Sequence, residues 1–508
     1  MNNTAAIVQN NTVLIKTVIG LAILLGTVAT WYAKVQNFDQ KYDDAWIGYR
    51  IAKNIAVGNG AVFNKGERVR ANTSLLYPVL ISPAFFADDA TAVHIVDLFD
   101  VATYIISVII FSALLAGLIK NHLNLEHWAV FPVIFLFTTS LQVVVLGMET
   151  QLYIIYITLT LYLYSVKRQY FAAFIISCLG IYIRPDAVLL TAVIFVYCIF
   201  VNRQSLVKYL LSGGAIAMVY FLISYMYYGE LIPHTAAVKD LLFPDKLKYL
   251  PGLLYGLFYP HNLTTFYSVF FIFGFIVFAR RPDPFFIWGI LYFLFFTFKA
   301  TWFVGFGWYR VPFGYFVNAL EAAGIAWVFL LVKNRLLKTS GPLIHTAFSS
   351  GAVILLCLYS YKIYDFNFIM AKDYNPRYKS TLRVTKQVAN TLIALNNNQY
   401  VLIEPLGFVG FFAFNQRFKD FPGLASKEVF EVVKSYEGKG HFFVYGKNVN
   451  EFSDIVARVP GINYAVLREN EAKQLLKGKV ITRDQIVLDC HEDTTNKATE
   501  RLIIVKTH

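Results

Sequence analysis

The chain has 508 residues, of which 57% are hydrophobic, 17% aromatic and only 15% charged, and its mean hydropathy is +0.52. These values exclude an ordinary soluble globular protein and indicate a protein with many membrane spans. The formal net charge of +13 would favour nucleic-acid binding in a soluble chain. In a membrane protein much of that excess lies in short loops that orient the spans, so we expect no nucleic-acid partner.

Apolar segments predict about eleven membrane-spanning helices, because each span needs about 20 apolar residues. The first segment lacks the features of a cleaved signal peptide and is expected to be a retained anchor. The run Leu75–Phe86 is short and contains Pro78 and Pro83, which favours an interfacial or re-entrant segment. The predicted spans are Thr12–Trp31, Ala92–Ile119, Trp128–Leu146, Gln151–Val166, Tyr170–Ile183, Ala187–Val201, Leu206–Tyr228, Thr264–Ala279, Pro284–Phe303, Val311–Val332 and Leu343–Tyr361.

Positively charged residues occur in every second loop, which predicts the orientation of the spans. Loops on the cytoplasmic side of a membrane collect Lys and Arg. The opposite loops include Asp43 and Asp44, the turns GMETQ and YIRPDA, and everything beyond Tyr361. The alternation therefore predicts a cytoplasmic N-terminus and a tail on the outer side. The basic loops carry Lys120; Lys167 and Arg168; Arg203 and Lys208; Arg280 and Arg281; and Lys333, Arg335 and Lys338.

The tail from about Lys362 is more polar, and its hydrophobic pattern has a shorter period. Ser380–Leu395 and KEVFEVVKSY (427–436) are predicted as amphipathic helices, and YVLIE (400–404) and HFFVYG (441–446) as short buried strands. The tail is therefore predicted to form a small α/β domain. The predicted domains are a membrane domain, residues 1–361, and a soluble domain, residues 362–508.

Two adjacent carboxylates, Asp43 and Asp44, follow the first predicted span. Ile47, Ile51 and Ile55 come next at helical spacing, which predicts a helix along the outer membrane surface with both acids in its first turn. The plain alternative is that one acid caps this helix and both suit its positive end.

Other charged and aromatic residues occupy the same predicted outer side. Each also has an ordinary interpretation: a first-turn Glu, a snorkelling ion pair, a solvated His, an interfacial aromatic belt. Because acids and cations share one face, we predict a pocket there that offers acids for proton transfer and cations for a lipid-linked phosphate. The glycines of residues 58–69 match no phosphate-binding loop. The residues are Glu149 in GMETQL, Arg184 and Asp186 in IRPDAV, His234 and Lys239 in YYGELIPHTAAVK, and Trp308, Tyr309 and Arg310 in GFGWYRVPFG.

Several motifs, in order from Asp43 to Leu424, resemble those of one enzyme family. They are DDAWIGYRIAKNIAVGNGAVFNKGERV followed by TS, GMET, RPD, YYGELIPHT with Lys239, LGFVGFF and DFPGL. They resemble the GT-C-fold polyprenyl-phosphate-dependent arabinofuranosyltransferases, the branch of the mycobacterial terminal arabinofuranosyltransferase and the pilin arabinosyltransferases. The chain departs from the family pattern at Arg70, Ala71 and Asn72, where an acidic residue, a glycine and an aromatic are usual, and at His234, where Pro-Asn-Thr is usual.

The resemblance implies a polytopic α-helical GT-C fold in the bacterial inner membrane, with a C-terminal periplasmic α/β domain. It implies transfer of a pentofuranose, D-arabinofuranose, from a polyprenyl-phosphate donor to a periplasmic acceptor, either a pilin-type protein or a glycan. Two alternatives stay open: a GT-C transferase for a hexose or an oligosaccharide, and a flippase for a lipid-linked sugar. No cofactor is required. A divalent cation occurs in some GT-C enzymes, but the acids are too scattered to predict a metal site.

Transfer of a sugar from a lipid phosphate to an acceptor hydroxyl requires a base and positive charges, and the candidate residues are assigned to these roles. Asp43, with Asp44 as the alternative, is expected to accept the proton of the acceptor hydroxyl. Arg184, Lys239 and Arg310 are expected to bind the donor phosphate. The residues expected to bind sugar or acceptor are Arg50, Thr73, Ser74, Glu149, Asp186, His234, Trp308 and Tyr309.

Overall fold

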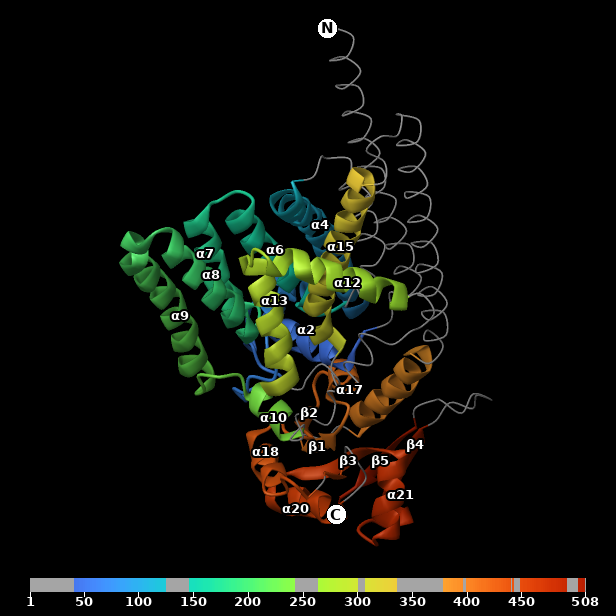
Figure 1. Ribbon diagram of the computed structural model, residues 1–508. Helices are drawn as coiled ribbons and strands as arrows, with labels where there is room; N and C mark the ends of the chain where they lie inside the picture. Colours follow the sequence, from blue (N-terminus) through green and yellow to red (C-terminus); the bar gives the residue numbers. More distant parts are fainter. Residues whose placement is uncertain are drawn as a thin grey trace.

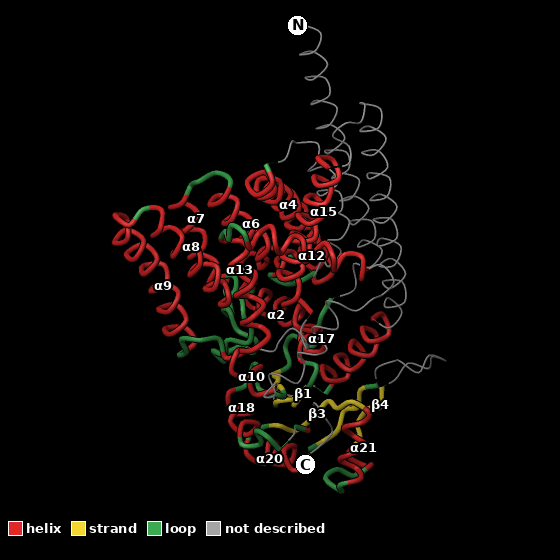
Figure 2. The backbone as a smooth tube through the Cα atoms, in the orientation of Figure 1, coloured by secondary structure: helices red, strands yellow, loops and turns green. Residues whose placement is uncertain are grey.

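The chain folds into a bundle of helices with a smaller α/β part at one end (Figure 1). The computed structural model describes residues 41–124, 146–242, 264–299, 307–335, 378–395, 399–439, 441–442, 448–490 and 501–507. Strands occur only in the smaller part of the described chain, near the C-terminus (Figure 2). Of the predicted spans, Thr12–Trp31, Leu343–Tyr361 and all but the last residue of Trp128–Leu146 lie outside these ranges.

Three of the described helices are long and apolar enough to cross a membrane. α4 begins where the Asp88 carboxylate accepts hydrogen bonds from the amides of Ala90 and Thr91, and it ends at Asn124 in the left-handed conformation. Both ends therefore follow from local capping. The three spans are α4 (Asp89–Leu123), the helix Arg203–Tyr228 that includes α9 (Leu206–Tyr228), and Arg310–Val332 within α15 (Arg310–Arg335).

Shorter apolar helices occupy most of the other predicted spans. Within the predicted span Pro284–Phe303, residues 284–294 form a helix that is followed by a π-helical turn, Phe295–Lys299, and residues 300–303 lie outside the described ranges. The predicted non-crossing run Leu75–Phe86 consists of two short helices, α3 (Leu76–Ile81) and η1 (Ser82–Phe86). The shorter helices are α6 (Thr150–Ser165), α7 (Tyr170–Leu179), α8 (Val188–Val201), α12 (Thr264–Ala279) and α13 (Pro284–Leu294).

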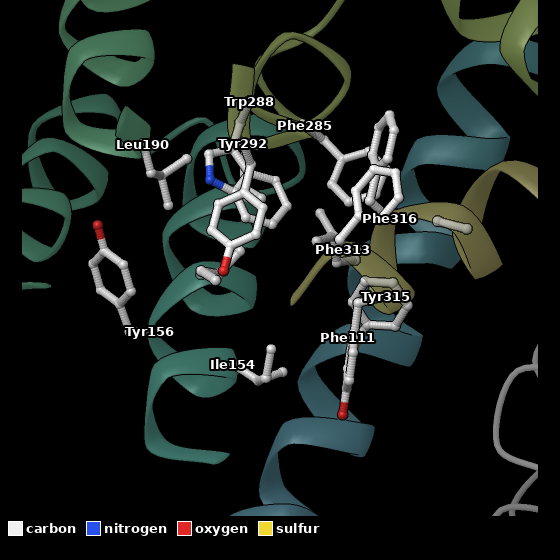
Figure 3. Packing of buried hydrophobic residues seen from close by; sticks show 14 of the residues in the cluster. Phe111, Ile154, Tyr156, Leu190, Phe285, Trp288, Tyr292, Phe313, Tyr315 and Phe316 are labelled. Carbon is white, nitrogen blue, oxygen red and sulfur yellow. The ribbon is translucent and has the colours of Figure 1, made fainter. Parts of the chain in front are cut away.

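Aromatic side chains fill the space between these helices. Figure 3 shows Phe285 of α13 close to Phe316 of α15. Trp288 and Tyr292, also from α13, belong to the same cluster. Both α13 side chains are almost completely buried. The Tyr292 hydroxyl donates a hydrogen bond to the Tyr309 carbonyl oxygen over 3.1 Å. The aromatic core thereby supports the short 3-10 turn η6 (Gly307–Tyr309) that leads into α15.

The smaller part contains one five-stranded sheet with the order β2-β1-β3-β5-β4. β1 pairs in parallel with β2 and β3, and β5 pairs antiparallel with β3 and β4. The predicted strand at residues 400–404 is confirmed as β1. The other predicted strand, residues 441–446, is wrong for His441 and Phe442, which are not in a strand, and its remaining residues lie outside the described ranges. The strands are β1 (Tyr400–Ile403), β2 (Arg417–Asp420), β3 (Ile462–Arg468), β4 (Ile486–Cys490) and β5 (Leu502–Lys506).

Alternate side chains of the strands face opposite sides of this sheet. Val401 and Ile403 belong to a cluster that faces the helix of residues 378–394, whereas Leu402 belongs to the opposite cluster. The opposite side is covered by α18 (Lys427–Lys434), α20 (Val449–Arg458) and α21 (Glu469–Lys477) (Figure 1). The predicted helices at residues 380–395 and 427–436 are therefore confirmed as helices against the sheet.

α2 (Asp43–Ala56) connects the two parts. The predicted helix and its two first-turn acids are confirmed. Its predicted place along the membrane surface needs correction, because Ile47 and Ile51 are buried against residues of the α/β part, among them Leu406 and Val409 of α17 (Leu406–Phe412). The helical spacing of the isoleucines indicated an apolar face correctly, but the tail covers that face.

Candidate functional site

A cavity lies where α2, the loop before α3, α10 (His234–Leu242), η6 and the α/β part meet. Its volume is about 460 Å³, including space open to solvent. Residues that are far apart in the sequence thus line the same cavity. They are Asp44, Ile47, Ala71, Asn72, Thr73, Tyr77, Gly147, Met148, Glu149, Thr235, Lys239, Trp308 and Leu424.

The two adjacent aspartates have different surroundings. Asp44 lines the cavity, whereas Asp43 points to the start of α17. The Asp43 carboxylate accepts hydrogen bonds from the amides of Gly407 and Phe408, both over 2.9 Å. A side chain at position 407 would also meet the Asp43 carbonyl oxygen at 1.9 Å, so glycine is required for this close approach. Asp43 therefore joins α2 to the tail, and of the two aspartates only Asp44 lines the cavity.

The pKa of both aspartates is raised by burial. For Asp43 the pKa rises to about 7, although the amides of Phe408 and Gly407 oppose this rise. For Asp44 burial also raises the pKa, and the positive charge of Lys239 opposes it. Asp44 and Lys239 are thus electrostatically coupled across the cavity, which suits an acid that must exchange a proton.

Asp43 should make the stability of the protein depend on pH. Its pKa is about 7 in the folded chain against an ordinary value of 3.8. A raised folded-state pKa contributes stability that is present below about pH 3.8 and is lost as the pH rises through about 7. Relative to Asp43→Asn, the wild type is therefore expected to lose thermal stability over this interval, as measured by melting in detergent. A Glu437→Gln control at an exposed site should keep the wild-type slope, and an unchanged slope in Asp43→Asn would contradict the assignment.

Lys239 lies against two aromatic rings at the edge of the cavity. Its ammonium group donates a hydrogen bond to the Tyr309 hydroxyl over 3.3 Å and lies 5.6 Å from the centre of the Trp308 ring. Burial opposes its charge, but Tyr309, Asp44 and Glu149 outweigh this effect and raise the Lys239 pKa. A buried ammonium group that keeps its charge is suited to bind an anion.

Arg184 lies behind Tyr309 and does not line the cavity. Its guanidinium group is 4.3 Å from the Tyr309 ring centre and 4.6 Å from that of Tyr153. It binds Asp186 through Nε and Nη2, over 2.9 and 3.1 Å. Its Nη1 and the Tyr153 hydroxyl are buried without a hydrogen-bond partner among the described residues. The predicted ion pair of Arg184 and Asp186 is therefore present, with spare donors on the side away from Asp186.

Glu149 reaches the cavity from a turn held by α4. The Asp100 carboxylate accepts hydrogen bonds from the Gly147 amide over 2.5 Å and from the Tyr77 hydroxyl over 2.9 Å. Gly147 has a φ of +77° and lies against Ala45 of α2, so a larger residue would not fit. Burial raises the pKa of Glu149, and the nearby charge of Arg184 opposes this rise. The turn thus brings a second carboxyl group close to Lys239 and Arg184.

The remaining predicted site residues have other positions. Arg50 is buried and donates to the carbonyl oxygens of Phe63 over 2.8 Å and Gln416 over 2.7 Å, as well as to Gly410. Its expected role in sugar binding is therefore corrected to a structural link between α2 and the tail.

Thr73 lines the main cavity, and its neighbour Ser74 lines a second cavity beside it. His234 packs on the Phe430 ring and lies outside the lining, although the adjacent Thr235 is part of it. Arg310 is exposed at the start of α15 and does not line the described cavity. The structure therefore supports fewer cavity residues than the sequence predicted.

Some contributing residues were not predicted from the sequence. Asp97 and Asp100 lie within the apolar helix α4, and Asp97 forms an ion pair with Lys41 over 3.0 Å. Ionisable residues inside an apolar helix are a recognised sign of function, so this signal was present. Leu424 of the DFPGL motif reaches the cavity because Asp420 accepts hydrogen bonds from the Leu424 and Ala425 amides.

Within the described ranges, no group of three or more His, Cys, Asp or Glu residues is arranged to hold a metal ion. The cavity as described offers Asp44 and Glu149 as its carboxylates.

Comparisons with known proteins agree with the motif resemblance. No family model matches the chain. A curated relative, the terminal beta-(1->2)-arabinofuranosyltransferase of Mycobacterium tuberculosis, is 26% identical over 219 residues, which is 39% of this chain. The match spans about a third of that relative's length, 34%. The predicted resemblance to a GT-C arabinofuranosyltransferase is thus confirmed over this part of the chain.

One solved structure has a similar fold. The Archaeoglobus fulgidus oligosaccharyltransferase, tethered to an acceptor peptide that contains the NVT sequon, matches with a TM-score of 0.52 and 13% identity, over 89% of this chain and 69% of that chain. At this identity the match concerns the fold alone. Together with the candidate spans, it supports a helical membrane protein of the GT-C type, whereas the predicted number of spans stays a prediction.

Proposed function

We propose that this protein is a membrane glycosyltransferase that transfers a pentofuranose, D-arabinofuranose, from a polyprenyl phosphate to an acceptor hydroxyl. The observation that carries the proposal is the cavity in which Asp44 and Glu149 share the lining with Lys239. This set offers a base and a cation within one cavity. The name of the mycobacterial relative supports the choice of sugar.

The donor phosphate would lie against Lys239, with Arg184 behind it. The lysine is held by Tyr309, and the same ring carries the Arg184 guanidinium on its face. Arg184 has a spare buried donor at Nη1. When the sugar leaves, negative charge grows on the phosphate, and preorganised cations in a dry site stabilise such charge strongly.

The transfer step would need one base and no covalent intermediate in its simplest form. The acceptor oxygen attacks the anomeric carbon, and its proton passes to the Asp44 carboxylate. The bond between the anomeric carbon and the phosphate oxygen breaks, and the electron pair leaves with the polyprenyl phosphate. Glu149, which shares the cavity lining, would hold sugar hydroxyls or stabilise positive charge on the ring.

The remaining walls would select the acceptor. Trp308 offers an apolar ring on one side, and the tail contributes Leu424. Thr73 and Thr235, whose hydroxyls are 3.4 Å apart, offer hydrogen bonds to sugar or acceptor. Since the tail forms part of the cavity, we propose that the α/β part guides a periplasmic acceptor, a pilin-type protein or a glycan, to the donor.

The proposed arrangement in the cell follows the charge pattern of the loops. Residues 1–361 would form the catalytic membrane domain, and residues 362–508 a periplasmic domain on the same side as the cavity. The N-terminus would lie in the cytoplasm, and the membrane would be the bacterial inner membrane. This orientation suits a lipid-linked donor, whose tail stays in the bilayer while its sugar reaches the outer cavity.

Cleavage of a labelled donor tests the proposed function. Purified protein in detergent is incubated with polyprenyl-phosphoryl arabinofuranose, labelled in the sugar, and candidate acceptors, and the products are separated by thin-layer chromatography. We expect label to leave the lipid and appear on an acceptor. A donor that stays intact while it crosses vesicle membranes would instead support a flippase. Faster transfer from a polyprenyl-phosphoryl hexose would contradict the choice of sugar.

Asp100 should affect transfer without touching the substrate. Asp100→Asn keeps the size of the side chain but removes one of the two acceptor oxygens that hold Gly147 and Tyr77. A displacement of Glu149 by about 1 Å would lower the turnover by about 10²-fold. Thr103→Val, whose hydroxyl bonds only to the backbone of its own helix, is the matched control and should transfer at the wild-type rate. Equal rates for Asp100→Asn and wild type would show that the turn needs no such support.

A further inference from the structure

A second cavity lies beside the first and shares Ala71 and Asn72 with it. Its open volume is about 250 Å³, including space open to solvent. Apolar and polar residues share its lining, and Arg70 is its one charged lining residue. The lining consists of Ile51, Ala61, Arg70, Ala71, Asn72, Ser74, Leu75, Pro78 and Tyr228.

Arg70 is buried, with only 2% of its surface exposed. Nη1 donates to the Tyr220 hydroxyl over 2.9 Å and to the Ser224 hydroxyl over 3.3 Å, and Nη2 donates to the Thr73 carbonyl oxygen over 3.0 Å. The guanidinium group also lies 5.3 Å from the Tyr220 ring centre. Each of these partners is neutral. Nε is buried and has no hydrogen-bond partner among the described residues.

The guanidinium groups of two other buried arginines, Arg184 and Arg50, have different partners. Arg184 binds the Asp186 carboxylate. Arg50 donates to several backbone carbonyl oxygens and is surrounded by rings, among them that of Phe63 at 4.5 Å. Arg70, in contrast, has neither a carboxylate partner within the described ranges nor a complete set of acceptors, and it lines a cavity. A buried charge without a counter-ion is expensive, which indicates that a ligand supplies the negative charge.

We propose that this second cavity is a subsite for an oxyanion, a carboxylate or a phosphate ester, bound by Arg70. Nε and one Nη2 hydrogen lie on the edge of a guanidinium group that binds oxyanions side on, as Arg184 binds Asp186 here. The burial of Arg70 strengthens such a contact, because bulk water screens a buried charge less than an exposed one. The spare Nε is the donor that the oxyanion would use.

We assign the oxyanion to the acceptor, because the second cavity adjoins the cavity that contains Asp44, the proposed base for the acceptor hydroxyl. The two cavities share Ala71 and Asn72 as a common wall. An acceptor whose anionic group binds Arg70 would extend along this wall toward Asp44. This assignment to the acceptor rests on the proposed function, whereas the binding of an oxyanion does not. The subsite would thus favour acidic acceptors over neutral ones.

Binding of simple anions tests the subsite directly. The purified full chain is titrated with sodium phosphate and with sodium acetate against sodium chloride at equal ionic strength, and thermal melting is recorded. Because Lys239 would also bind phosphate, the titration is repeated in Lys239→Met. We expect phosphate to stabilise the Lys239→Met variant in a saturable way. In the double variant with Lys239→Met and Arg70→Met, the affinity for phosphate should be at least tenfold weaker. Arg68→Gln, an exposed arginine two residues away, is the matched control and should bind as wild type does.

The outcomes separate the subsite from the proposed function. If Lys239→Met shows no saturable phosphate or acetate binding, the subsite is overturned, whether or not the Arg70 variants fold. In the Lys239→Met background, Arg70→Lys, which keeps the charge, should retain part of the binding. An Arg70→Met substitution that leaves the phosphate affinity of Lys239→Met unchanged would also overturn the subsite. Stabilisation by polyprenyl phosphate alone would overturn the assignment to the acceptor and indicate a lipid head group. Donor cleavage by wild-type protein is measured separately and depends on none of these results.

Discussion

Asp44→Asn is expected to lower sugar transfer by about 10²- to 10⁴-fold, the usual effect of removing a general base. Asn keeps the shape of the side chain but cannot accept the proton of the acceptor hydroxyl. The effect is measured as the initial rate of label transfer from the polyprenyl-phosphoryl sugar at saturating donor. Since burial raises the pKa of Asp44 and the base must be ionised, the wild-type rate should rise with pH through that pKa. The residual rate of the variant should lack this rise.

Asp43→Asn is the matched control, because it changes the neighbouring residue in the same way. Asp43 bonds to the amides of Gly407 and Phe408, so its substitution should affect stability far more than turnover by the folded protein. Rates are compared per folded protein, after size-exclusion chromatography. If Asp43→Asn loses transfer while Asp44→Asn keeps the wild-type rate, the two aspartates have been assigned in the wrong order.

Lys239→Met is expected to lower transfer by about 10²- to 10³-fold, in line with the loss of one preorganised group that stabilises a developing negative charge. Met keeps most of the length and the apolar part of the side chain, but neither the charge nor the hydrogen bond to Tyr309. The KM for the donor should rise, and the KM for the acceptor should stay the same, because Lys239 is proposed to contact the donor phosphate and not the acceptor. Steady-state kinetics with each substrate varied in turn measures both.

The control for this variant is Lys53→Met. Lys53 is on α2, pairs with Asp89 over 2.6 Å and does not line the cavity. Its substitution should leave both KM values unchanged. A Lys239→Met variant with normal donor KM and normal turnover would contradict the proposed role of Lys239 in phosphate binding. Arg184 would then be the remaining candidate cation.

Much of the helical framework could be predicted from the sequence, because a membrane span has a strong and local signal. The run Leu206–Tyr228 was predicted and is observed as α9, and Thr264–Ala279 as α12. Their ends follow from changes between apolar and polar residues, which the sequence displays directly. The tail was harder, since strands such as β5 (Leu502–Lys506) are short and take their place from pairing with distant strands.

The candidate site was predicted in part. The alternation of basic loops predicted one outer face for Asp44, Glu149 and Lys239, and the structure brings them to one cavity. The sequence could not tell Asp43 from Asp44, because adjacent residues of a helix point about 100° apart and the tail decides which of them is covered. Arg50 was misassigned for the same reason, since its partners Phe63 and Gln416 come from a distant loop and from the tail.

Residues that act through others were the least predictable. Asp100 holds the turn of Gly147 across 47 positions of the sequence, and no local pattern indicates such a contact. The acid was nevertheless visible as a charge inside an apolar helix, a feature that calls for a structural or functional partner.

A structure of the purified protein with a donor analogue that cannot be cleaved, such as a polyprenyl phosphonate of arabinofuranose, tests the central claim most directly. We predict that the phosphonate contacts the Lys239 ammonium and that the anomeric carbon lies in the cavity beside Asp44 and Glu149. The Asp43 carboxylate should stay bound to the Gly407 amide. A sugar bound outside this cavity, with the phosphonate away from Lys239, would contradict the account.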